Sequence, residues 1–172
     1  MKLYSKILTT KLKNIFFFLL ISFLVISLDQ VSKYLIHDPL KEGFFIIPNF
    51  LKITYFENKG VAFGIKLNQI LIYGLILLFL IIVLIFFEKV LFERKWKAVF
   101  MGFVFGGAIS NVIDRITVGA VKDIFEFYYF SAFPSGLVFN LADVFIVVGT
   151  ISLIIFFWRE EKCKMQNAKI KM

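Results

Sequence analysis

Acidic residues gather in one stretch of the chain, residues 106–143, which reads GGAISNVIDRITVGAVKDIFEFYYFSAFPSGLVFNLAD and lies between two apolar segments. A carboxylate beside hydrocarbon is costly unless it is paired, hydrogen-bonded or protonated. Two of the four acidic residues, Asp123 and Asp143, are the candidates for catalysis. Two carboxyl groups brought together at a membrane edge cannot both ionise readily, so they share a proton. Such a pair can perform general acid/base hydrolysis.

The composition predicts an integral membrane protein, because 60% of the 172 residues are hydrophobic and 24 are Phe. The net charge of +8 does not indicate nucleic-acid binding, since the basic residues fall between apolar runs, where they fix membrane orientation. Cys163 and His37 are the only residues of their types, so a disulfide within the chain is impossible and a zinc site is disfavoured. We expect no metal and no cofactor, although the sequence leaves a metal held only by carboxylates open.

The predicted fold is an all-α membrane protein of one domain, residues 1–172, with four transmembrane helices. Turn-forming residues and alternating stretches such as FLKITYF predict a small β-rich segment on the outer side, between the first and second helices. The last residues form a polar tail that we expect to lack fixed structure or to lie on the membrane surface. The predicted bounds are 14–36, 67–87, 97–114 and 137–158 for the helices, 38–66 for the β-rich segment and 159–172 for the tail.

Two groups of polar residues are spaced to share a helix face. Lys33 follows Asp29 by four residues, so the two side chains can lie on one helix face. Lys33 either offsets the charge of Asp29 inside the membrane or forms a plain surface pair with it. The spacing does not distinguish these two alternatives. Asn111, Asp114 and Arg115 stand at i, i+3 and i+4 and therefore project from one face at the end of the third helix.

Two further polar positions lie at turns or helix starts. Asn58 precedes Gly60, which permits a close backbone approach or marks a bare turn. Asn140 lies three residues before Asp143, so the two are expected to point together, away from lipid.

The distribution of Lys and Arg predicts the orientation. The N-terminal segment, the linker after the second helix and the C-terminal tail hold 13 of the 20 basic residues. Basic residues favour the cytoplasmic side, so both termini are predicted to be cytoplasmic. The candidate polar residues then all fall near the outer face.

The strings DQVSK, ENKGVAFG, GGAISNVIDR, VKDIF and FNLAD, in this order on a chain with four spans, resemble bacterial lipoprotein signal peptidase, also called signal peptidase II. The resemblance covers about residues 30–158 and implies that Asp123 and Asp143 are the catalytic aspartates. The residues expected to bind substrate or to support this pair are Asp29, Lys33, Asn58, Gly60, Asn111, Asp114, Arg115 and Asn140.

The resemblance also implies an aspartic endopeptidase of the bacterial cytoplasmic (inner) membrane, which cleaves prolipoproteins on the amino side of a Cys carrying diacylglycerol. Its partners would be lipid-modified prolipoproteins and membrane lipids, without nucleic acid; a monomer is expected, although the sequence does not fix the oligomeric state. The alternative from another class is a small channel or transporter whose Asp residues bind ions. A structural membrane subunit is a third possibility, which leaves the charges without a role.

The predicted orientation is tested by labelling Cys163, which lies in the C-terminal tail. A membrane-impermeant thiol reagent should leave Cys163 unmodified in intact cells and modify it after lysis, because the tail is cytoplasmic. Labelling before lysis would place the carboxylate pair on the cytoplasmic side.

Overall fold

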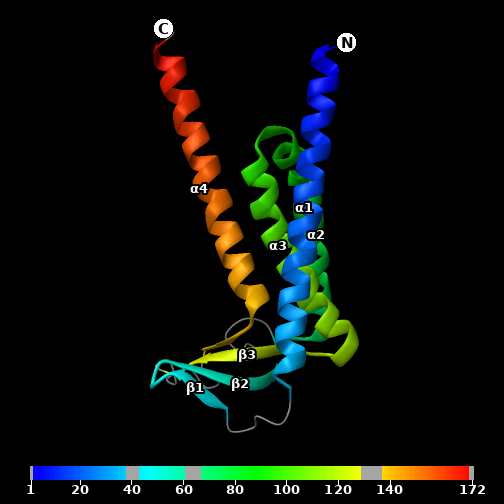
Figure 1. Cartoon of the computed structure of the whole chain (residues 1–172), viewed down its shortest axis with the longest axis vertical. Helices are drawn as coiled ribbons and strands as arrows, with labels where there is room; N and C mark the ends of the chain where they lie inside the picture. Colours follow the sequence, from blue (N-terminus) through cyan, green and yellow to red (C-terminus); the bar gives the residue numbers. More distant parts are fainter. Residues whose placement is uncertain (1, 38–42, 61–66, 129–136, 171–172) are drawn as a thin grey trace.

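The computed structural model describes residues 2–37, 43–60, 67–128 and 137–170. Four helices form a bundle, and a four-stranded antiparallel sheet lies across the end of the bundle that is far from both termini (Figure 1). The ends of the predicted β-rich segment, 38–42 and 61–66, lie outside the described residues. The elements in chain order are α1 (Lys2–Leu35), β1 (Phe44–Ile47), β2 (Leu51–Asn58), α2 (Gln69–Glu93), α3 (Lys95–Val118), β3 (Val121–Phe127), β4 (Leu137–Phe139) and α4 (Leu141–Ile170).

Three helices are long and apolar enough to cross a membrane: Ile7–Leu35, Lys95–Val118 and Leu141–Ala168. The described apolar part of α2, Gln69–Val83, is shorter than these three helices. Large apolar side chains such as Phe23 are exposed on the outside of the bundle, where only lipid would keep them from water. These features agree with the predicted membrane protein.

α3 lies between α1 and α4 and contacts both through small residues (Figure 1). A Cβ atom on Gly106 would lie 2.8 Å from the backbone oxygen of Ser22 in α1, and one on Gly107 would lie 2.6 Å from that of Ala142 in α4. Without side chains at these positions, the helix backbones approach closely.

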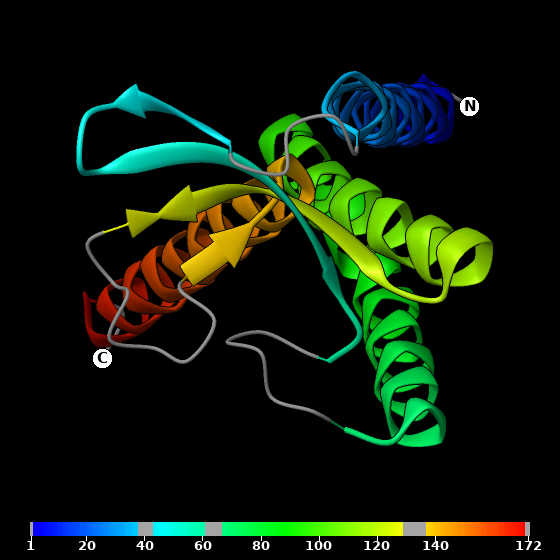
Figure 2. The same cartoon turned by 90° about the horizontal axis from the view of Figure 1, so that it is seen from below.

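The sheet has the strand order β1-β2-β3-β4, and Figure 2 shows the strands crossing beneath the helices. The sequence prediction was incomplete here, because it placed strands only within 38–66, whereas β3 and β4 come from the stretch between α3 and α4. The aromatic run of β3 forms a strand because it pairs with β2. The register of this pairing places Asp123 opposite Phe56. The pairing joins residues far apart in sequence, so local pattern did not reveal it.

Helix bounds also differ from the prediction. α1 begins at Lys2 instead of residue 14, and α4 begins at Leu141, after β4, instead of residue 137. The helix then continues to Ile170, so the described part of the polar tail is helical, because its residues include good helix formers and neither Gly nor Pro. Gly119 ends α3 with a φ of 78°, a backbone conformation that glycine adopts readily.

The close contact between α1 and α3 yields a stability prediction. Gly106→Ala should destabilise the protein by about 1–3 kcal/mol, because the new Cβ atom would overlap backbone atoms of Ser22. Gly74→Ala in α2 is the matched control, since a Cβ atom there meets nothing within 4 Å. Thermal unfolding of both variants in detergent measures the difference. Equal unfolding temperatures would contradict the close approach of α1 and α3.

Candidate active site

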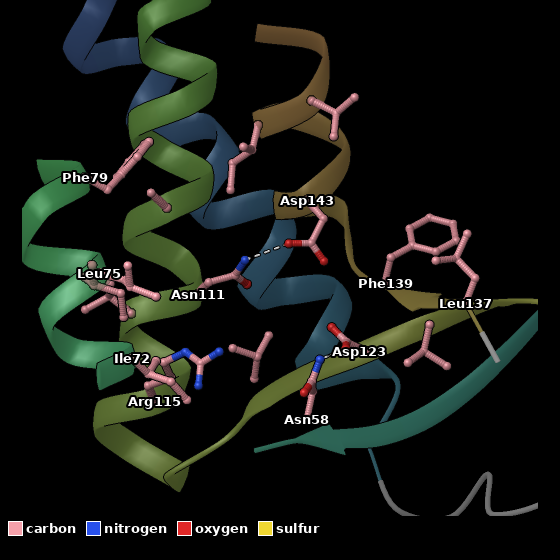
Figure 3. Close-up of a pocket in the computed structure, with 17 residues that line it drawn as sticks. Asn58, Ile72, Leu75, Phe79, Asn111, Arg115, Asp123, Leu137, Phe139 and Asp143 are labelled. Carbon is pink, nitrogen blue, oxygen red and sulfur yellow. Dashed lines mark hydrogen bonds between the residues drawn. The ribbon is translucent and has the colours of Figure 1, made fainter. Parts of the chain in front are cut away.

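A cavity of about 640 Å³ opens where α2, α3, the sheet and the start of α4 meet, and both candidate carboxylates line it (Figure 3). Asp123 lies on β3, and Asp143 lies in the first turn of α4. The side chains of Asp123 and Asp143 therefore come from separate elements and line the same cavity. The structure thus brings together the two residues that the sequence singled out.

Asp123 is buried and accepts hydrogen bonds on both carboxyl oxygens. Asn58 Nδ2 donates to Oδ2 over 3.2 Å, and Asn140 Nδ2 donates to Oδ1 over 2.8 Å. The Asn58 side chain is itself fixed, because the backbone N–H of Gly60 donates to its Oδ1 at 2.9 Å. The orientation of the Asp123 carboxyl group is therefore set from β2 and from the start of α4.

Asp143 is oriented by the N-terminus of α4. Its backbone N–H donates to Asn140 Oδ1 at 2.9 Å, and its own Oδ2 accepts from the backbone N–H of Asn140 at 3.2 Å, which is the reciprocal pattern of a capping box. Asn111 Nδ2 of α3 donates to the other oxygen, Oδ1, at 2.9 Å. Asn140 consequently contacts both candidate carboxylates.

The pKa of Asp123 is raised from 3.8 to about 7, first by burial of the carboxyl group and then by the nearby charge of Asp143. The amide groups of Asn58 and Asn140 act in the opposite direction, because they donate to the ionised carboxylate. The effect of desolvation on the pKa of Asp123 is larger than the effect of these hydrogen bonds. Asp123 can therefore hold a proton near neutral pH, as acid/base chemistry requires.

Lys33 forms the centre of a buried ionic cluster beside the cavity. Its Nζ lies 2.6 Å from Asp29 Oδ2 and 2.7 Å from Asp114 Oδ2, and all three side chains are buried. Lys33 also donates to Asn111 Oδ1 at 3.2 Å, so the cluster contacts a residue that holds Asp143. The structure excludes a plain surface pair between Asp29 and Lys33.

The two carboxylates of this cluster reach other elements. Asp29 accepts from the backbone N–H of Ala142 at 2.9 Å, at the start of α4, and from Ser110 Oγ at 2.7 Å. Asp114 Oδ2 accepts from the backbone N–H of Lys122 in β3 at 3.1 Å. The cluster therefore joins α1, α3, α4 and β3.

Gln30 belongs to the same network and was not predicted. Its Nε2 donates to Ser110 Oγ at 3.0 Å and to Asp114 Oδ1 at 3.1 Å. A signal was present in the sequence, because Gln30 is a polar residue directly after Asp29 near the end of an apolar helix. Polar side chains in such helices usually face protein instead of lipid.

Asn111, Asp114 and Arg115, which share one face of α3, have different partners. Asn111 contacts Asp143, Asp114 turns to Lys33, and Arg115 lines the cavity. Arg115 Nη2 donates to the backbone carbonyl of Gly60 at 2.7 Å, so it anchors the chain that follows β2. Asp114 and Asp29 are not among the residues that line this cavity.

The opposite wall of the cavity is apolar and was also missed. It is built by Ile72, Leu75 and Phe79 of α2, whereas Leu137 and Phe139 of β4 add apolar lining on the side of the carboxylates (Figure 3). Apolar residues in a hydrophobic helix carry no local mark that separates a cavity wall from a lipid-facing surface. Only the packing of α2 beside α3 identifies them.

The family model described as signal peptidase (SPase) II matches residues 21–159 of this chain. The chain belongs to the signal peptidase II family. A lipoprotein signal peptidase of Caldanaerobacter subterraneus subsp. tengcongensis is 40% identical over 75% of this chain and 87% of its own. One from Staphylococcus aureus strain JH9 is 35% identical over 87% of this chain and 92% of its own.

Two solved structures of bacterial membrane enzymes, obtained by the in meso method, are also similar to this signal peptidase II family member. The first, at 2.3 Å resolution, has a TM-score of 0.74 and 31% identity, and covers 86% of this chain and 90% of its own. The second, at 1.9 Å resolution, has a TM-score of 0.68 and 33% identity, with coverage of 81% and 91%. Membership in the family indicates a protease and, with the apolar helices, a bacterial membrane protein.

The electrostatics of Asp123 predict a titration near neutral pH. Infrared difference spectra of the purified protein should show a carboxylic acid band that disappears as the pH rises through about 7, because Asp123 then loses its proton. The band should be absent in Asp123→Asn. In Asp143→Asn the midpoint should fall to lower pH, because the neighbouring negative charge is removed. An unchanged midpoint would show that the two carboxyl groups are not coupled.

Proposed function

We propose that this protein removes signal peptides from prolipoproteins whose Cys carries diacylglycerol, by cleaving on the amino side of that Cys with Asp123 and Asp143 as the catalytic residues. Its relatives are named lipoprotein signal peptidases, which supports the substrate class. The observation that carries the proposal is the pair of carboxyl groups facing one cavity with an apolar opposite wall. A cavity of this kind can accept both an extended peptide and the lipid attached to it.

The chemistry follows from the unequal protonation of the pair. The ionised carboxylate takes a proton from a water molecule, and the water oxygen attacks the scissile carbonyl carbon. The protonated carboxyl group hydrogen-bonds the carbonyl oxygen and gives its proton as the tetrahedral intermediate forms. The C–N bond then breaks as the carboxyl group that took the proton from water gives it to the leaving nitrogen, and the intermediate returns one proton to the other carboxylate as the new carbonyl forms. We assign no step to a metal or other cofactor.

The proposed topology has four spans, with α2 as the fourth, both termini in the cytoplasm and the carboxylate pair near the outer face of the inner membrane. The position of the pair beside the sheet, at the end of the bundle far from both termini, supports this arrangement (Figure 1). The lipid chains of the substrate would then stay in the bilayer beside Ile72 and Phe79 during the reaction. Burial within the site also limits competing water.

The structure favours this reaction over an ion channel or transporter. A channel needs polar groups along a path across the membrane. Apolar side chains, including Phe18, Met101 and Phe105, pack together in the bundle away from the carboxylate pair. The polar groups of the site instead gather beside the sheet.

Replacing either catalytic residue tests the mechanism. Asp123→Asn and Asp143→Asn should each reduce precursor cleavage by about 10²–10⁴-fold, because an amide cannot accept a proton from water at neutral pH. The double variant should be scarcely worse, because the two groups act as one unit. The measurement is the rate at which a purified variant cleaves a lipid-modified precursor. Substantial cleavage by either single variant would overturn the aspartyl mechanism.

Two comparisons sharpen this test. Glu126→Gln is the matched control, because Glu126 lies on the same strand as Asp123 but does not line the cavity. It should retain normal cleavage. Asp29→Asn and Asp114→Asn should be milder than the catalytic variants and should retain turnover, because these residues position other groups.

A further inference from the structure

A second cavity, of about 620 Å³, lies at the other end of the bundle, beside the start of α3 and the last part of α4. α4 diverges from α3 toward this end (Figure 1). Arg94, which caps the start of α3, lines this cavity, whereas Asn111 beside the catalytic pair is about 26 Å further along the helix axis at 1.5 Å per residue. No described residue lines both cavities. The second cavity is therefore separate from the candidate active site.

The lining of this cavity is basic. Arg94, Arg159 and Lys164 contribute cationic groups. The acidic residue among the described lining residues is Glu160, and its carboxylate is held by the buried Nζ of Lys97 at 2.6 Å. Because this acid is already paired, the three cations leave the cavity with an excess of positive charge. The cavity is suited to an anion.

Neighbouring aromatic residues indicate that the cavity lies at the depth of lipid headgroups. Trp96 and Trp158 are exposed on α3 and α4, close in sequence to the basic lining residues, and Trp favours the membrane interface. Phe156 provides an apolar part of the lining and packs against Phe100, with ring centroids 5.8 Å apart. The cavity thus offers cations at headgroup level and an aromatic surface toward the bilayer interior.

We propose that this cavity binds an anionic phospholipid, with the headgroup phosphate at Arg94 and Arg159 and one acyl chain along Phe156. A guanidinium group can donate two parallel hydrogen bonds to a phosphate, and Lys164 adds a third positive charge. Basic cavities between membrane helices suit anionic headgroups. A zwitterionic lipid is disfavoured, since its own cation would be repelled. A bound lipid would fill the space where α3 and α4 diverge.

Cys163 offers a direct test, because it lines the cavity, is exposed and is the only Cys in the chain. The full chain in a zwitterionic detergent is titrated with phosphatidylglycerol, with phosphatidylcholine or with inorganic phosphate, and the rate of Cys163 alkylation by a soluble maleimide is measured. Phosphatidylglycerol should slow alkylation severalfold and saturably, whereas phosphatidylcholine and inorganic phosphate should not. The assay contains no peptide substrate, so its outcome is independent of the proposed proteolysis.

Paired variants separate a defined site from general surface charge. Arg94→Gln with Arg159→Gln should weaken the apparent affinity for phosphatidylglycerol at least about tenfold, because two cations leave the cavity. Lys95→Gln with Lys162→Gln removes two cations nearby that do not line the cavity, and should leave the affinity unchanged. Equal losses in both double variants, equal protection by both lipids, protection by phosphate alone, or no protection would each overturn the proposal.

Discussion

The buried ammonium group of Lys33, held between Asp29 and Asp114, is the interaction on which the site depends. Removing one partner from a buried ionic cluster typically costs about 3–5 kcal/mol, because the remaining charges stay without compensation. The two carboxylates also accept backbone N–H groups at the start of α4, from Ala142, and at the start of β3, from Lys122. These are the elements that carry the candidate catalytic residues. The cluster therefore fixes the relative position of the pair without lining the cavity itself.

Hydrogen bonds orient the two carboxyl groups, and burial raises the pKa of Asp123. Asn140 serves both carboxyl groups, since it caps α4 beside Asp143 and donates to Asp123. Amide donors hold the geometry but favour the ionised form, so they oppose the desolvation that raises the pKa of Asp123. The apolar wall beyond the pair increases that desolvation. Fixed polar groups and an apolar wall thus meet in one cavity.

Much of the fold was accessible from the sequence, because long apolar runs and turn residues are local signals. The helices and strands at the positions of β1 and β2 were predicted. β3 and β4 were not, because a strand in an aromatic-rich stretch is defined by its partner, and β2 lies more than sixty residues before β3 in the chain. The C-terminal extension of α4 was not predicted, since the polar composition of the tail indicated either a lack of fixed structure or a position on the membrane surface, whereas helix propensity extended the helix.

For the site, the sequence by itself determined which groups are ionisable and which can share a helix face, and hence the candidates Asp123 and Asp143. It could not assign their surroundings, because spacing along one helix says nothing about which neighbour that helix faces. Only the tertiary structure turned Asp114 toward Lys33 and Asn111 toward Asp143, although both project from α3. The charge state of Asp123 was likewise decided in three dimensions. Burial and the approach of a second carboxylate depend on distant segments packing together, and no local pattern encodes that packing.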